Sequence, residues 1–150
     1  MSDLLLPELD ELTAPFWEGC RLGELRVQQC PQSGRLIHPP RYRSPFAPHV
    51  APRWLALSGR GAIWSAAEPH PPLIPQFAAL APYNIVIVAA DEDPAIRFVG
   101  NLVASEQAEI DSVAFENIVI GAPVRVVFQP VTDADGTVFA MPRWVLVDPG

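Results

Sequence analysis

Histidine, serine and cysteine are the residue types that could carry acyl-transfer or hydrolytic chemistry here, because such sites pair a nucleophile with a base. The three histidines are His38, His49 and His70, and none stands beside a serine or cysteine in a nucleophile-elbow pattern such as GxSxG. All ten basic residues are arginine, so catalysis through a lysine Schiff base is excluded. We therefore expect no catalytic turnover by this chain alone.

Two aspartate pairs and one glycine-rich stretch could offer other chemistry. Asp91 with Asp93 and Asp133 with Asp135 each lie in a predicted turn, where aspartate commonly bonds to its own backbone. The stretch SGRG at residues 58–61 is followed by neither a helix nor a lysine, which a phosphate-binding loop requires. We interpret both aspartate pairs and the glycine-rich stretch as ordinary turn residues.

The amino-acid composition limits the classes of protein to which this chain can belong. The chain has 150 residues, a formal net charge of −7 and 49% hydrophobic residues, which predicts one globular domain, with or without a small appended module. The acidic balance argues against binding to nucleic acid, which depends on phosphate neutralisation by basic side chains. Eighteen prolines favour extended segments and turns over long helices.

The number of cysteines and the hydropathy of the chain indicate the cellular compartment. Cys20 and Cys30 are too few for a disulfide framework. The apolar run at residues 4–6 is short and flanked by acids, unlike a signal peptide. The longest apolar stretch, residues 77–90, is too short to span a bilayer. We expect a cytoplasmic protein that makes no membrane contact.

The elements that must position any site are organised around residues 83–103, which predict two adjacent strands joined by an acidic turn. Ile96, Phe98 and Leu102 share one face of the second strand, with a period of two. Gly100 marks a bulge or a sharp bend. The first strand is apolar on both faces, which favours a small closed barrel whose outer face is partly covered.

The N-terminal part predicts short helices followed by a hairpin. A helical turn follows Pro7, and a helix runs from Phe16 to about Leu22, with Thr13 as its N-cap and Pro15 in its first turn. Further predicted segments are strands at 25–30 and 35–38, an extended connector at 41–53, a bent strand at 54–65, a proline-rich loop at 69–82, a helix at 106–114 capped by Ser105, a strand at 124–128, a turn at 133–136 and a strand at 138–147.

Five strands with a helix between the third and fourth give the order of an OB-fold. The predicted fold class is therefore mainly β: a five-stranded OB-fold barrel preceded by short helices and a ribbon hairpin. We divide the chain into an N-terminal helical segment at 1–24, a hairpin and connector at 25–53, and an OB-fold domain at 54–150.

Several ordered segments together resemble a known family. They are FWEGCRLGELRVQQCPQSGRLIHPPR, WLALSGRGAIWS, PYNIVIVAADED, RFVGNLV and IGAPVRVVF. They resemble the OB-fold acyl-CoA-associated proteins that carry an N-terminal rubredoxin-like zinc ribbon, over about residues 15 to 145. The resemblance implies a non-catalytic accessory subunit, whose partner is a thiolase-superfamily enzyme such as a steroid side-chain thiolase or aldolase.

The chain departs from this family at the zinc ligands. Where the family pattern has four cysteines, the resemblance places Cys30, Ser33, Ser44 and Ala47. Structural zinc requires four thiolate or imidazole ligands, so we predict a degenerate ribbon without zinc. A substitute site of Cys20, Cys30, His38 and His49 is conceivable, but its spacing matches no standard zinc pattern.

Docking residues are expected among the large apolar side chains that one small domain cannot bury. Phe16 and Trp17 either pack on the barrel or dock a partner. The expected partner interface consists of Phe16, Trp17, Leu73, Ile74, Phe77 and Tyr83. We expect this chain to be linked to the acyl-CoA substrate only through its partner enzyme. Alternative functions are a partner of a MaoC-like enoyl-CoA hydratase or an acyltransferase complex, and a single-stranded nucleic-acid-binding OB-fold.

Overall fold

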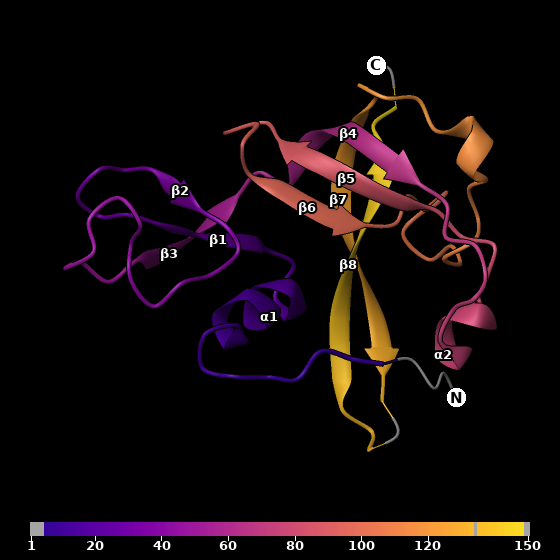
Figure 1. The fold of residues 1–150 in the computed structure, drawn as a ribbon, viewed down its shortest axis with the longest axis horizontal. Helices are drawn as coiled ribbons and strands as arrows, with labels where there is room; N and C mark the ends of the chain where they lie inside the picture. Colours follow the sequence, from indigo (N-terminus) through magenta and orange to yellow (C-terminus); the bar gives the residue numbers. More distant parts are fainter. Residues whose placement is uncertain (1–4, 134, 149–150) are drawn as a thin grey trace.

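A computed structural model describes residues 5–133 and 135–148 and shows two sheets with a helix between them (Figure 1). A long hairpin extends from the larger sheet, past the rest of the barrel. The elements are α1 (Ala14–Arg21), β1 (Leu25–Gln29), β2 (Leu36–Ile37), β3 (Arg53–Leu57), β4 (Arg60–Ala67), α2 (Pro75–Ala78), β5 (Ile85–Ala90), β6 (Arg97–Gly100), the 3₁₀ turn η1 (Phe115–Asn117), β7 (Pro123–Thr132) and β8 (Val138–Leu146).

The larger sheet is a curled antiparallel sheet with strand order β6-β5-β4-β7-β8. A parallel bridge between Leu102 and Trp144 joins the end of β6 to β8 and so links the two edges. The N–H of Val103 donates to the carbonyl of Trp144 at 2.8 Å, and the N–H of Trp144 donates to the carbonyl of Asn101 at 3.0 Å. Joining the edges in this way confirms the predicted mainly-β, five-stranded OB-fold barrel.

The barrel core follows from strand alternation. Along β5, Val86, Val88 and Ala90 are buried and the residues between them are half-buried, as expected for a strand with one face inside. Trp144 is the largest fully buried side chain. A Cβ placed on Gly100 would lie only 3.1 Å from the Trp144 indole, so Gly100 allows the close approach of the ring rather than forming a bulge.

The smaller sheet has strand order β2-β1-β3 and forms the ribbon. Leu25 and Val27 of β1 join the barrel residues in one core cluster, so the base of the ribbon is packed on the barrel. β3 pairs with β1 in this sheet, whereas β4 pairs with β5 and β7 in the barrel. The predicted bent strand at 54–65 is therefore two strands, one in each sheet, and the proposed division after residue 53 falls at the start of β3.

The predicted helix at 106–114 is wrong. Residues 104–114 form turns and bends, held by two short turn bonds within the segment and by bonds from side chains of the barrel to its carbonyl groups. Gln129 donates to the carbonyls of Glu106 and Ala108, and Asn84 donates to the carbonyl of Val113. Such side-chain bonds replace helical bonds, and Ser105 therefore caps no helix.

Two smaller differences concern helix ends. The single turn α2 lies inside the expected proline-rich loop, and Pro75 occupies its first turn, where proline is tolerated. Thr13 precedes α1 as expected but makes no capping bond with its side chain. Asp10 accepts bonds from the Thr13 N–H and hydroxyl instead, and these bonds lower the pKa of Asp10. Within the described residues, no helix is long and apolar enough to cross a membrane.

Candidate functional site: ribbon knuckle and interaction surfaces

The structure brings together the four positions where the related family carries zinc ligands. We call Cys30, Ser33, Ser44 and Ala47 the knuckle. The Ser33 N–H donates to Cys30 Sγ at 3.5 Å, and Ser44 Oγ accepts from the N–H groups of Phe46 at 3.1 Å and Ala47 at 3.3 Å. Cys30 and Ala47 belong to one small buried cluster.

The knuckle is centred on one sulfur, and Ser33 is the exposed member of the four. Cys30 is 0% exposed and Ser44 is buried. Hydrogen bonds from the Ser33 and Ser44 hydroxyls lower the pKa of the Cys30 thiol to about 7, while burial of the sulfur acts in the opposite direction. The sulfur therefore accepts bonds from the groups that would be its co-ligands in a zinc ribbon.

The knuckle residues do not fit a structural zinc ion. Zinc in such sites takes four thiolate or imidazole ligands, and only Cys30 can supply one. The Ser44 hydroxyl already accepts two backbone N–H groups, and the Ala47 methyl group has no donor atom. Across the described residues, no group of three or more histidine, cysteine, aspartate or glutamate side chains could hold a metal ion.

The conceivable substitute zinc ligands are not brought together. Cys20 lies in α1, where burial raises its thiol pKa to about 12. The His38 ring packs 4.6 Å from the Phe98 ring and 6.1 Å from the Phe16 ring, centroid to centroid. Burial lowers the His38 pKa to about 4, so this imidazole is neutral. His49 is exposed in the connector.

The expected docking residues fall into two separate groups. Phe16 and Trp17 are half-buried on α1, and the Trp17 ring meets the Phe139 ring of β8 edge to face at 5.9 Å. These contacts correspond to the packing alternative for the N-terminal helix. In the view of Figure 1, α1 and α2 lie on opposite sides of the β7–β8 hairpin.

The second group lies on the loop between β4 and β5. Ile74 is 49% exposed, Leu73 and Phe77 are half-buried, and Tyr83 is only 8% exposed. The Phe77 and Tyr83 rings lie 6.3 Å apart. Ile74 is thus the most accessible of the six expected interface residues.

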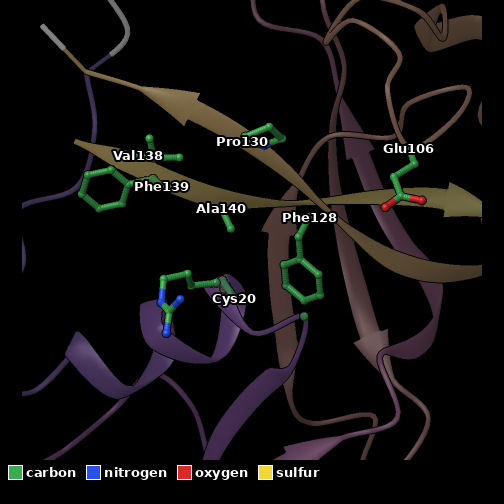
Figure 2. Close-up of a pocket in the computed structure, with 9 residues that line it drawn as sticks. Cys20, Glu106, Phe128, Pro130, Val138, Phe139 and Ala140 are labelled. Carbon is green, nitrogen blue, oxygen red and sulfur yellow. The ribbon is translucent and has the colours of Figure 1, made fainter. Parts of the chain in front are cut away.

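A pocket that the sequence did not reveal lies between α1 and the β7–β8 hairpin (Figure 2). It has a volume of about 460 Å³ and opens to solvent. Its lining is mostly apolar and comes from Cys20, Arg21, Gly23, Glu106, Phe128, Pro130, Val138, Phe139 and Ala140. The pocket joins residues more than a hundred positions apart, so no local sequence pattern could have found it.

Several exposed apolar side chains lie outside the six expected interface residues, and two of them are on the outer face of the barrel. Trp64 on β4 is 50% exposed and Val99 on β6 is 72% exposed. A signal was present, because strand alternation places Val99 on the face of Arg97 and opposite to the buried Phe98. The docking face was expected on the proline-rich loop and adjoining barrel strands, but the six named residues lie on α1 and between β4 and β5.

The described elements define a class: a small OB-fold protein with an N-terminal ribbon whose metal-ligand positions are largely lost. Residues 54–129 match the family described as "ChsH2, C-terminal OB-fold domain", and the chain belongs to this family. The family resemblance noted in the sequence is thereby confirmed.

Individual relatives agree with this assignment. The chain is 30% identical over 125 residues to the 3-oxo-4,17-pregnadiene-20-carboxyl-CoA hydratase alpha subunit of Mycobacterium tuberculosis; the match covers 83% of this chain but only 36% of that protein's length. A chain of the Ltp2-ChsH2(DUF35) aldolase is similar over 94% of this chain and 98% of its own, with a TM-score of 0.72 and 25% identity. A DUF35-family protein of unknown function from Sulfolobus solfataricus shares the fold, with a TM-score of 0.54 over 91% of this chain and 86% of its own, and 11% identity.

Proposed function

We propose that this chain is a non-catalytic accessory subunit that binds and supports an acyl-CoA enzyme of the thiolase superfamily. The proposed partner is a thiolase or retro-aldolase of steroid side-chain or lipid degradation. The observation that carries the proposal is the similarity to a chain of the Ltp2-ChsH2(DUF35) aldolase, because it extends over 94% of this chain and 98% of the other. A cytoplasmic location is part of the same proposal.

The chemistry of the described residues supports a binding role. His38 is buried between aromatic rings and neutral, and the Cys20 thiol is buried with a raised pKa. Neither group suits nucleophilic or acid–base catalysis, which needs a side chain that is both activated and accessible. The Cys30 thiol has a lowered pKa but is fully buried. We propose that the partner supplies the catalytic residues and meets the acyl-CoA substrate.

The proposed docking face combines the loop at 69–82 with adjoining barrel strands, and Phe16 and Trp17 of α1 form a second, separate contact. The direct test is co-expression with the thiolase-superfamily enzyme of the same genome, or with Ltp2 as a defined probe. We expect a stable complex and a retro-aldol activity that requires both chains. A pure isolated chain that turns over an acyl-CoA substrate would contradict the accessory role.

Phe77→Asp tests the docking face, with Phe115→Asp as its matched control at an exposed position in η1, outside the loop. We expect the Phe77 variant to lose at least about tenfold in affinity, since a buried aromatic anchor commonly costs 2 kcal/mol or more on removal. A folded variant that binds with unchanged affinity would place the docking face elsewhere. An unfolded variant would assign Phe77 to the core, and Ile74→Asp would then test the loop.

A second candidate function follows from the named relative, which is a hydratase alpha subunit. In this alternative the partner is a MaoC-like enoyl-CoA hydratase, or an acyltransferase complex. Hydration of an enoyl-CoA by the co-expressed pair, without retro-aldol cleavage, would favour it. A gel shift with single-stranded DNA would instead favour the nucleic-acid-binding alternative.

We also propose that the ribbon holds its shape without zinc. The knuckle supplies one thiolate, two hydroxyl groups already in backbone hydrogen bonds, and a methyl group. Elemental analysis of the purified protein is expected to give far less than one zinc per chain. About one zinc per chain, retained through dialysis against a chelator, would contradict this.

A further inference from the structure

The outer face of β4, β5 and β6 is an apolar surface with an unusual composition. Register places Ile87 opposite Val99, and Ala62 opposite Ala89. A β-bulge between Ile63 and Ser65 places Ser65 opposite Ile87 as well, and Trp64 lies in this bulge with half of its side chain exposed. The side chains of Ala62 and Ala89 are small, so the surface at the centre of this face is lower than at the large Trp64 indole.

Three arginines border this apolar centre. Arg60 lies directly opposite Arg125 across the β4–β7 pair, and Arg97 lies opposite Ala89. All three are exposed. The Arg97 guanidinium lies 3.7 Å from the centroid of the Trp64 ring. We call Arg60, Trp64, Arg97, Val99 and Arg125 the arginine face.

These guanidinium groups have no acidic partner in the part of the chain that the structure describes. The ion pairs found there involve Arg21, Arg26 and His70. Asp91 lies beside Arg60, and its N–H donates to the Arg60 carbonyl at 3.0 Å, but no ion pair joins their side chains. Like charges directly opposite each other on neighbouring strands are unfavourable, so Arg60 and Arg125 together form a site that favours an external carboxylate.

We propose that the arginine face is a docking surface for a partner protein that presents an apolar patch bordered by carboxylates. The proposal rests on the proposed function and adds to the 69–82 loop a specific contact patch on the barrel strands next to it. Tryptophan and arginine are the residue types that most often dominate binding energy at protein interfaces. Arginine also binds carboxylates through two parallel hydrogen bonds. Burial of exposed apolar surface such as that of Val99 contributes favourable free energy of binding.

Charge and symmetry exclude the competing occupants. A second copy of this chain on the same face would, in a two-fold dimer, set the arginines of one copy against those of the other. Single-stranded nucleic acid needs free aromatic faces and a basic groove. Here Arg97 covers one face of Trp64. A carboxylate-bearing protein surface meets neither obstacle.

The test compares the double variant Arg60→Glu/Arg125→Glu with a matched control, Arg41→Glu/Arg43→Glu. The control makes the same charge change at two exposed arginines of the ribbon connector. Affinity for Ltp2, or for the thiolase-superfamily enzyme of the same genome, is measured by calorimetry at two salt concentrations. We expect the double variant to bind at least about tenfold more weakly, with a reduced salt dependence, and the control to change by less than about twofold.

The outcomes separate the two proposals. If the native chain binds neither enzyme, the proposed function fails, and the arginine face fails with it. If the native chain binds and the double variant binds equally well, the arginine face is wrong while the accessory function stands. A dimer of this chain, or a shift of single-stranded DNA, that disappears in the double variant would also overturn the proposal. If the glutamate substitutions unfold the chain, Arg60→Gln/Arg125→Gln replaces them in the test, and its expected loss of affinity is smaller.

Discussion

The tip of the ribbon and the core of the barrel are built on different physical principles. The barrel core is one large apolar cluster that includes Ile63, Val86, Val88 and Trp144. The ribbon tip, residues 30–50, has a small cluster of Cys30, Ile37 and Ala47 and depends on polar bonds around one sulfur. Apolar burial scales with area, so the barrel can stand alone whereas the tip requires its hydrogen bonds.

If the ribbon holds no zinc, as proposed, hydrogen bonds must hold the turns of its tip. In the knuckle, backbone N–H groups that would point at zinc-bound thiolates point instead at Cys30 Sγ and Ser44 Oγ. Each bond contributes only about 1 kcal/mol net. The tip should therefore open locally at a much lower free energy than the barrel.

The largest effect is expected in the barrel core. Trp144→Ala removes the largest fully buried side chain, which is 2% exposed and contacts the Phe98 ring at 6.0 Å. We expect a loss of about 3–5 kcal/mol in the free energy of unfolding, measured by urea denaturation. Trp64→Ala is the control, because the same residue type in the same sheet is half exposed; its loss should stay below about 1 kcal/mol.

A smaller effect is expected from the polar residues that tie loops to the barrel. Asn84 is completely buried; its side chain accepts from the Leu102 N–H and donates to the carbonyls of Leu102 and Val113. Asn84→Ala leaves these groups without partners and should cost about 2–3 kcal/mol. Asn117→Ala, an exposed substitution in η1, should cost little. Equal losses would show that the Asn84 bonds are replaced by water.

Strand pattern predicted much of the barrel. The alternation of Phe98 and Val99, and the turn chemistry after residue 90, predicted the strand pair β5–β6. The segment at 54–65, however, is two strands, and the described residues between the third and fourth predicted strands contain the 3₁₀ turn η1 but no α-helix. The loop at 104–114 was mispredicted because its bonds go to Asn84 and Gln129, which are distant in sequence. Local propensity carries no information on such partners.

The candidate site was less accessible to sequence reasoning. The four knuckle positions were located by resemblance, and the structure brings them together. The arginine face needed the strand register, because Arg60 and Arg125 are far apart in sequence and opposite in space. Half-burial of Phe16 against the core could not be read from its residue type, which suits packing and docking equally.

The junction between ribbon and barrel should respond to acid. His38 packs against Phe98 of the barrel and Phe16 of α1, and burial lowers its pKa from 6.5 to about 4. The unfolded chain therefore binds a proton below pH 6.5 that the folded chain does not bind until about pH 4. The stability that His38 contributes is complete above pH 6.5 and is lost progressively as the pH falls from 6.5 toward 4.

Urea midpoints measured across this range should fall in the native protein and fall less in His38→Phe, which removes the titrating group and keeps an aromatic ring. His49→Phe, at an exposed position, is the control and should follow the native curve. Identical curves for all three proteins would show that the His38 imidazole reaches water before it takes up a proton.

The smallest effect, and the sharpest test of the comparison, concerns Cys30. Cys30→Ala removes the acceptor of the Ser33 N–H and the centre of the small cluster, so the tip should open more often, by about 1 kcal/mol or roughly fivefold in opening equilibrium. Hydrogen exchange should accelerate at the Ser33 and Ala47 amides and stay unchanged at Val86. Cys30→Ser keeps an acceptor and should recover part of the protection. If Cys30→Ala instead lowers the global urea midpoint as much as Trp144→Ala, tip and barrel form one cooperative unit, and the distinction between them fails.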